Sequence, residues 1–391
     1  MIAAPVHPVP PRHGAAVEWW MYQVCRRLRG YQPTIICTHA EGYAREEEAE
    51  GVRYHRIQIG RLYRRLFQKI TRLDPWSYVK RAARLIDAIQ PAIVHVQNSP
   101  KLLTDLRRVV RTQTRYILHM QNEMQVSDWR HDDVLIADSR YLKSVYDARM
   151  PQASVDVITN GVDIETFRPA WEVESETRAL KQKLGIPADK KIVMYAGRMS
   201  PEKGPLDLVR AFRELLRRRD DIFLVLIGEL RRGDAANPRV RYGNEILAAC
   251  DEIKTHCHLA GSIDPAHIHN YYVLADLVVV PSEFEEPFGM VAVEAMAAGV
   301  AVLAARKGGL KEFVHEGETG FLIANTKDYP GLAQRIGNLL DQPQALARIG
   351  RSARDYAGRH HNWEEVARQT QNVYAQMLGD AGSKMAAGVR R

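Results

Sequence analysis

The 391-residue sequence predicts a protein of two α/β domains, each built around a doubly wound parallel sheet. Three observations lead to this prediction. Short, almost wholly apolar segments alternate with helical patterns, these segments form two series, and a polar connection separates the series. Strands covered by helices on both faces of a parallel sheet are apolar along their whole length. The length of the chain suits two domains of ordinary size.

The expected elements follow the chain in order. The first series of strands is Thr34–Thr38, Ile93–Val96, Tyr116–His119, Val134–Ala137 and Val155–Thr159. The second series is Lys191–Ala196, Ile222–Gly228, His256–Ala260, Leu277–Val280 and Ala301–Ala304. Helical patterns lie between them, for example at Pro205–Arg218 and Pro265–Ala275. Alternation of this kind is typical of parallel sheets with crossover helices.

The boundary between the domains is expected in Asn160–Lys190, which is polar and contains Pro169. We therefore predict an N-terminal Rossmann-like domain over 1–165, a C-terminal Rossmann-like domain over 166–360, a crossover helix over 361–378 and a disordered tail over 379–391. Ligands of open parallel sheets bind at the carboxyl ends of the strands. With two such sheets, we expect the site in the cleft between them.

Positive charge is concentrated in one segment. From Val52 to Arg84, ten Lys or Arg residues oppose one acid, Asp74, and apolar residues are interleaved. The pattern indicates a basic amphipathic helix suited to anionic headgroups or phosphorylated sugars, although a solvated helix face fits it equally well. No nucleic-acid motif accompanies the charge. Without a secretory signal or a span of ~18–20 apolar residues, we expect a cytoplasmic protein, peripheral on the inner face of the membrane.

The most informative segment runs from Pro281 to Gly299 and reads P-S-E-F-E-E-P-F-G-M-V-A-V-E-A-M-A-A-G. An apolar strand precedes it, and a helix is expected from about Met290. The N-terminus of a helix favours a bound anion. Glu294, on the first turns of this helix, is suited to accept hydrogen bonds from two adjacent hydroxyls, as on a ribose. Glu286, in the preceding loop, is suited to reach a sugar.

A second segment, Tyr195–Gly204, lies between an expected strand and a helix. Arg198 and Lys203 suit a diphosphate, since one provides a guanidinium fork and the other an ammonium point charge. Gly197 permits close approach of the backbone. Gly308 and Gly309 follow the next strand, where a tight strand-to-helix turn alone would favour glycine. No Asp-x-Asp run occurs, so no metal ligand is assigned.

The Glu-x7-Glu spacing inside E-P-F-G-x-x-x-x-E-A-M-A-x-G resembles glycosyltransferase family 4, the retaining enzymes of the GT-B fold. The resemblance implies a metal-independent transferase that uses a nucleotide sugar and no cofactor. It also implies that the domain over 1–165 binds the acceptor and that the domain over 166–360 binds the nucleotide sugar. By this resemblance the catalytic residues are Glu286, His119, Arg198 and Lys203. The implied donor-binding residues are Glu294, Gly14, Gly197, Phe288, Gly289, Gly308 and Gly309. His119 ends an expected strand, and a core histidine is an equally good interpretation of it.

Pro10–Glu18 matches the glycine-rich loop of the family, with Gly14-Ala15 where Gly-Gly is common. Its Gly-Ala-Ala-Val-Glu-Trp run and Tyr63–Lys69 resemble a narrower group, the transferases of the lipopolysaccharide outer core. This implies transfer of N-acetylglucosamine from UDP-N-acetylglucosamine to a core hydroxyl, with segment 52–84 at the inner-membrane surface. The alternatives are UDP-glucose or UDP-galactose on a lipopolysaccharide or capsule acceptor, and an inactive nucleotide-binding scaffold.

Overall fold

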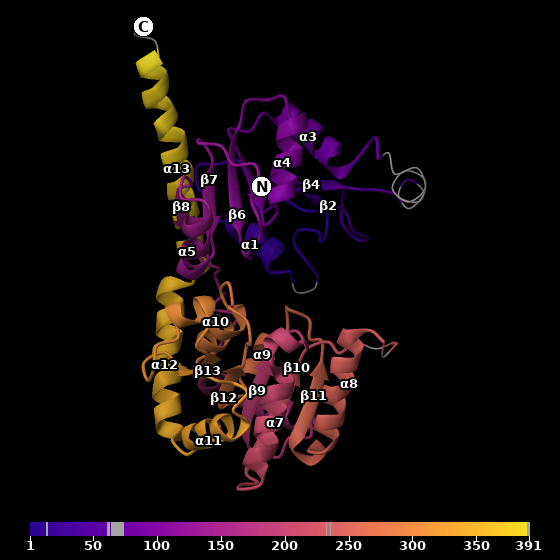
Figure 1. The fold of residues 1–391 in the computed structure, drawn as a ribbon, viewed down its shortest axis with the longest axis vertical. Coiled ribbons are helices and arrows are strands. Elements are labelled where there is room, and N and C mark those ends of the chain that lie inside the picture. The colour runs from indigo at the N-terminus through magenta and orange to yellow at the C-terminus, as the bar shows by residue number, and fades with distance from the viewer. Residues whose placement is uncertain (13–14, 61–62, 64–73, 232, 235, 389–391) are drawn as a thin grey trace. The chain divides into compact units, whose positions relative to one another are not determined.

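The computed structural model describes residues 1–12, 15–60, 63, 74–231, 233–234 and 236–388. The chain divides into two compact units: Met1–Gly161 with Trp363–Arg391 (unit 1), and Val162–Asn362 (unit 2). Each unit is a largely parallel sheet with helices packed against it (Figure 1). The predicted fold class, two doubly wound α/β domains, is confirmed.

Unit 1 contains an eight-stranded sheet in the order β3-β4-β2-β1-β5-β6-β7-β8. Its elements are β1 (Ile2–Ala3), α1 (Ala16–Cys25), β2 (Thr34–Thr38), β3 (Glu46–Ala49), β4 (Val52–Ile57), α3 (Tyr78–Ile89), β5 (Ile93–Gln97), α4 (Pro100–Val109), β6 (Arg115–Met120), β7 (Val134–Ala137), α5 (Arg140–Arg149), β8 (Val155–Val157) and α13 (Trp363–Gly388). Only the edge pair β3–β4 is antiparallel among the pairings of this sheet.

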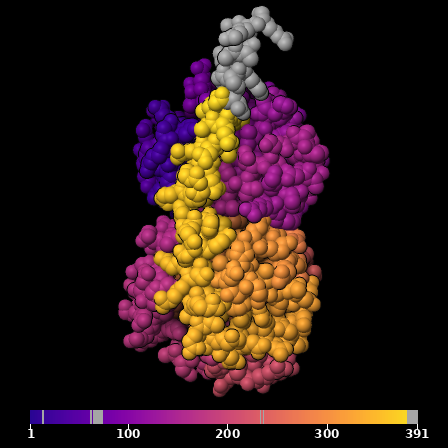
Figure 2. Space-filling view, turned by 90° about the vertical axis from the view of Figure 1, so that its left-hand side faces the viewer, coloured from indigo at the N-terminus to yellow at the C-terminus, as the bar shows by residue number. Residues whose placement is uncertain are grey.

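Helix α13 belongs to unit 1 although it follows unit 2 in the sequence. Trp363 and Tyr374 are buried with Trp20 of α1 in the core on one face of the sheet. Gly161 makes room for this packing, since a Cβ there would lie 2.6 Å from the Trp363 ring. Figure 2 shows the yellow surface of α13 lying along the indigo and purple residues of its own unit.

Unit 2 contains a six-stranded, wholly parallel sheet in the order β11-β10-β9-β12-β13-β14. Its elements are α6 (Glu174–Lys183), β9 (Lys191–Ala196), α7 (Pro205–Leu216), β10 (Ile222–Ile227), α8 (Pro238–Asp251), β11 (Cys257–Gly261), α9 (His269–Tyr272), β12 (Leu277–Val280), α10 (Met290–Ala297), β13 (Val302–Ala305), β14 (Phe321–Ile323), α11 (Tyr329–Leu340) and α12 (Pro343–His360).

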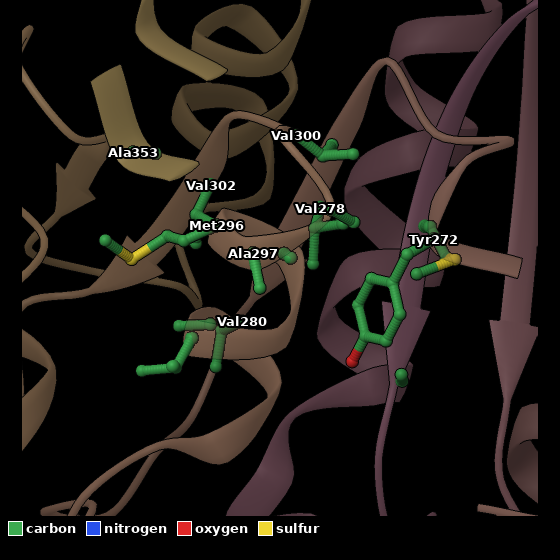
Figure 3. Packing of buried hydrophobic residues seen from close by; sticks show 14 of the residues in the cluster. Tyr272, Val278, Val280, Met296, Ala297, Val300, Val302 and Ala353 are labelled. Atoms are coloured by element: carbon green, nitrogen blue, oxygen red, sulfur yellow. The ribbon is translucent and has the colours of Figure 1, made fainter. Parts of the chain in front are cut away.

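Both faces of the sheet are buried at β10, β12 and β13, which explains why these strands are apolar throughout. Val278 and Val280 of β12 pack on one face with Met296 of α10 (Figure 3). Leu277 and Val279 pack in a separate cluster on the opposite face. Successive side chains of a strand point to opposite faces, so a strand covered on both sides has no polar position.

The predicted basic helix over residues 52–84 was wrong in its first part. Val52–Ile57 forms β4, in which Val52 and Tyr54 are buried and Arg53 is exposed. This alternation belongs to a strand, and the buried, charged Arg56 interrupts it in the sequence. Helix α3 begins at Tyr78, whereas residues 61–62 and 64–73 lie outside the described residues.

Two helices also differ from expectation. The helix expected over Pro265–Ala275 is limited to the four residues of α9. Helix α13 extends to Gly388, into the segment from residue 379 that was expected to be a disordered tail. Within the described ranges, no helix has both the length and the apolar character that a membrane span requires.

Gly350 on α12 provides a test of this packing, because a Cβ there would lie 2.0 Å from the carbonyl oxygen of Gly299. We expect Gly350→Ala to lower the free energy of unfolding by about 2 kcal/mol, as overpacking does. Gly358→Ala on the same helix is the matched control. Its Cβ would lie 3.9 Å from Ile164 Cγ1, and removing a helical glycine stabilises by ~0.5–1 kcal/mol. Urea denaturation measures both, and equal midpoints would contradict the prediction.

Candidate functional site

The candidate site lies at the carboxyl edge of the unit 2 sheet, where three loops follow neighbouring parallel strands. Strands β9, β12 and β13 are adjacent in the sheet order. The chain leaves β9 toward β10 on one side, whereas β12 and β13 extend the sheet on the other side. Ligands of such sheets bind where the strand order reverses in this way. The predicted segments after β9, β12 and β13 therefore share one edge.

The loops after β9 and β12 are joined through their backbones. The amide of Glu283 donates to the carbonyl oxygen of Glu202 at 2.9 Å. Gly204 has φ +70°, and a Cβ there would lie 2.2 Å from the carbonyl oxygen of Pro281. Gly204 ends the short 3-10 turn Pro201–Lys203 in the left-handed conformation. This contact brings the side chain of Lys203 to the second loop.

Lys203 and Glu286 form the central ion pair of the site. The Nζ atom of Lys203 donates to Oε1 of Glu286 at 2.7 Å and to Oε2 at 2.9 Å. Glu286 is 5% exposed, and Ser282 Oγ, itself buried, also donates to Oε1. The ammonium lies 4.7 Å from the ring centroid of Phe284. The two predicted residues therefore meet, and Ser282 and Phe284 were missed by the sequence analysis.

Arg198 lies on the same edge with its guanidinium exposed. Its Nη1 atom is 3.2 Å from Oε1 of Glu202. Tyr195 OH donates to the Arg198 carbonyl oxygen at 2.6 Å, which fixes the backbone that carries the side chain. Gly197 has φ +150°, in the region that favours glycine. The exposed Arg198 guanidinium can therefore exchange its Glu202 partner for a bound phosphate.

Gly308 and Gly309 pack directly on the loop that carries Glu286. The Gly309 amide donates to the Glu286 carbonyl oxygen at 2.7 Å, and the Gly308 amide donates to the Glu285 carboxylate. A Cβ on Gly308, at φ +51°, would lie 2.0 Å from the Glu286 carbonyl oxygen. Both glycines are therefore required by the close backbone approach, whatever ligand the edge binds.

Glu294 on α10 accepts a hydrogen bond from the Tyr272 hydroxyl at 2.7 Å. Burial raises the pKa of Glu294 to about 7, and the bond from Tyr272 partly opposes that rise. Tyr272 ends the four-residue helix α9, and no motif pointed to it. Gly289, with φ +111°, precedes α10, where a Cβ would meet Leu310 Cδ2 at 2.5 Å.

Phe288, predicted to bind the donor, has a buried ring. Its centroid lies 5.3 Å from that of Phe313 and 5.4 Å from that of His361. The side chain is therefore a core residue beneath the loop, and the apolar neighbours explain why a phenylalanine stands there. Among the described residues, no group of three or more His, Cys, Asp or Glu side chains is arranged to hold a metal ion.

In unit 1, His119 lies in the core and is fully buried. Its ring centroid is 4.5 Å from that of Trp20 and 5.5 Å from that of His95. Burial lowers the pKa of His119 to about 3, so the ring is neutral. Neither ring nitrogen has a hydrogen-bond partner in the described part of the chain. The structure favours the core interpretation over contact with a sugar, whereas Gly14 lies outside the described residues.

Two family models match the chain. Residues 17–166 match "Glycosyltransferase Family 4", and residues 176–356 match "Glycosyl transferases group 1". The lipopolysaccharide 1,2-N-acetylglucosaminetransferase of Salmonella typhimurium is 37% identical over 93% of this chain and 94% of its own. Spore coat protein SA of Bacillus subtilis is 26% identical over 96% of this chain and 98% of its own.

Solved structures share the fold. Sucrose-phosphate synthase of Thermosynechococcus elongatus superposes with a TM-score of 0.75, at 23% identity over 97% of this chain and 99% of that chain. Anabaena HepE in complex with UDP and glucose has a TM-score of 0.73, at 21% identity over 96% and 98% of the two chains. These neighbours have the GT-B fold, which the sequence predicted.

Removing the Lys203 ammonium tests the central ion pair. Lys203→Met leaves the buried Glu286 carboxylate without its cation, so we expect the free energy of unfolding to fall by about 2–3 kcal/mol. The double variant Lys203→Met/Glu286→Gln should recover at least half of that loss, since no uncompensated charge remains. Lys327→Met is the control, because this exposed lysine pairs with Glu283 at 3.5 Å and should change stability by less than ~0.5 kcal/mol. Equal losses in the single and double variants, measured in guanidinium, would refute the coupling.

Proposed function

The chain belongs to the glycosyltransferases of group 1 and family 4, and from that premise we propose that it transfers N-acetylglucosamine from UDP-N-acetylglucosamine to a hydroxyl of the lipopolysaccharide core. The proposed reaction retains the anomeric configuration and uses no metal ion. The observation that carries the proposal is the similarity to the Salmonella transferase, which extends through both units.

A uridine nucleotide is the proposed donor carrier. The fold neighbour HepE was solved in complex with UDP and glucose, which supports a UDP-sugar as the donor of this chain. In our proposal, the two hydroxyls of the ribose donate to the Glu294 carboxylate. The hydroxyl of Tyr272, 2.7 Å from Glu294 Oε2, holds the carboxylate in position for them.

Electrostatic stabilisation of the leaving group is the proposed source of catalysis. Negative charge grows on the diphosphate as the bond to the sugar breaks, and preorganised cations stabilise such charge without reorganisation. Lys203, Arg198 and the amide groups at the start of α10 supply that stabilisation. We place Glu286 against the hydroxyls of the transferred sugar. We propose Gly197, Gly289, Gly308 and Gly309 as close backbone neighbours of the donor.

The proposed acceptor is anionic and held at a membrane. We propose that the basic segment 52–84 contacts the inner face of that membrane. Among its described residues, the Arg84 guanidinium lies 3.9 Å from the centroid of the Trp76 ring, and Trp76 is 44% exposed. Tryptophan and arginine together suit the headgroup region of a bilayer.

The donor sugar is tested by UDP release from UDP-N-acetylglucosamine, UDP-glucose and UDP-galactose in EDTA, with and without truncated lipopolysaccharide core. We expect release from UDP-N-acetylglucosamine to rise at least tenfold when the acceptor is added, since water is a poor substitute acceptor in a closed site. Acceptor-dependent release from another UDP-sugar alone would refute the donor assignment. UDP binding without any release would favour an inactive scaffold.

The ribose assignment is tested by the pH dependence of UDP-sugar binding. With a pKa of about 7, the Glu294 carboxyl is half ionised at pH 7 and becomes mostly ionised above it. We therefore expect affinity to rise from pH 6 to pH 8, with a loss of up to about tenfold per unit below the pKa. Titration calorimetry with UDP-N-acetylglucosamine measures this, because its diphosphate does not titrate in that range.

Two variants make this test specific. Glu294→Gln should flatten the pH profile, because the amide does not titrate. In the wild type, the hydrogen bond from Tyr272 lowers the pKa of Glu294. Tyr272→Phe removes this bond, so it should move the midpoint of the pH profile to higher pH. A profile that is identical in the wild type and in Glu294→Gln would remove Glu294 from the ribose role.

A further inference from the structure

We infer that the Lys203–Glu286 pair makes the donor site reject the spent nucleoside diphosphate in favour of the intact nucleotide sugar, and so promotes product release. The inference rests on the proposed function, because it takes a UDP-sugar as the donor. It assigns to Glu286 a second role beyond contact with the sugar, namely discrimination between substrate and product.

The first observation is that each of the two site cations has a carboxylate partner. Lys203 donates to both oxygens of Glu286, at 2.7 and 2.9 Å. Arg198 lies 3.2 Å from Glu202. A diphosphate therefore enters a site whose positive charge is already matched, and it must draw Lys203 away from Glu286. Binding of phosphate alone exchanges one ion pair for another.

The second observation is that Glu286 cannot turn to water when Lys203 leaves. The residue is 5% exposed, and the Gly309 amide holds its backbone by a 2.7 Å bond to its carbonyl oxygen. The close approach of Gly308 prevents the loop from moving inward. Among the described residues, Ser282, which is 1% exposed, is then the one remaining donor to the carboxylate. A buried carboxylate with one hydroxyl donor is strongly destabilised.

The nucleotide sugar and the spent diphosphate differ in the hydrogen-bond donors that they bring to the Glu286 carboxylate. A nucleotide sugar brings hydroxyl donors next to Glu286 as its diphosphate takes Lys203. The spent diphosphate brings none, and it carries about one more negative charge because the oxygen that held the sugar becomes a terminal phosphate oxygen. In the product complex, Glu286 and the diphosphate compete for a single ammonium. Release of the product restores the Lys203–Glu286 pair.

Glu285 provides a matched comparison within the same loop. Its carboxylate is exposed and accepts from the Gly308 amide. Water stabilises an exposed carboxylate whatever the ligand carries, so its charge is screened. Neutralising Glu285 should therefore affect UDP and UDP-sugar alike, whereas neutralising Glu286 should affect them differently.

The experiment measures the affinities of the full-length protein for UDP, UDP-N-acetylglucosamine and UDP-glucose by titration calorimetry. We expect Glu286→Gln to bind UDP about tenfold more tightly than the wild type, or about 1.4 kcal/mol, and to bind the sugar nucleotides equally or more weakly. Glu286→Asp keeps the charge and should not tighten UDP. Glu285→Gln should keep the wild-type ratio of the affinities.

A second variant tests the inference without neutralising Glu286. Ser282→Ala removes the hydroxyl donor from the carboxylate, so it should weaken UDP binding more than binding of the sugar nucleotides. The inference is overturned if Glu286→Gln changes UDP and UDP-sugar affinity in parallel, or if Ser282→Ala leaves their ratio unchanged. A wild-type protein that binds no uridine nucleotide would overturn the proposed function, and this inference with it.

Discussion

The geometry of the candidate site at the carboxyl edge of the unit 2 sheet depends on loop backbones that lie too close together to leave room for a Cβ atom. Gly204 lies against Pro281, and Gly308 lies against Glu286, at positions where a side chain would overlap a carbonyl oxygen. These two contacts hold the loops after β9, β12 and β13 at fixed spacing. The ion pair between Lys203 and Glu286 is a consequence of that spacing, because it joins two of the loops. The ion pair at this edge therefore depends on the close packing of the glycine backbones.

Much of the fold was predictable because the strands of unit 2 are buried on both faces. Continuous apolar segments such as Lys191–Ala196 and Leu277–Val280 have the same bounds in the structure as in the sequence analysis. Strand β4 was not predictable in the same way. It lies next to the edge strand β3, and its two arginines differ in burial: Arg53 is exposed, whereas Arg56 is buried and donates to the Val9 carbonyl oxygen. Because a charged residue lies on the buried side, the sequence does not show the alternation of a strand.

The candidate site was predictable where its residues follow each other in one loop, and not where the fold alone brings them together. The segment around Glu286 and Glu294 carries its own pattern. Tyr272 reaches Glu294 from a different helix, and nothing near it in the sequence indicates that contact. The burial of His119 depends on Trp20 of α1, and neighbouring His95 bonds to Tyr374 of α13, 279 residues away. Long-range packing of this kind leaves no local periodicity.

The discontinuity of unit 1 has a consequence for synthesis of the protein on the ribosome. All of unit 2 leaves the exit tunnel before Trp363, Val366 and Tyr374, which complete the core around Trp20. Domains generally fold as units while the chain grows. Unit 2 can therefore reach its native state first, although it comes second in the sequence. Part of the apolar surface of the N-terminal residues therefore stays exposed until α13 has left the tunnel, and in that interval the nascent chain depends most on protection by chaperones.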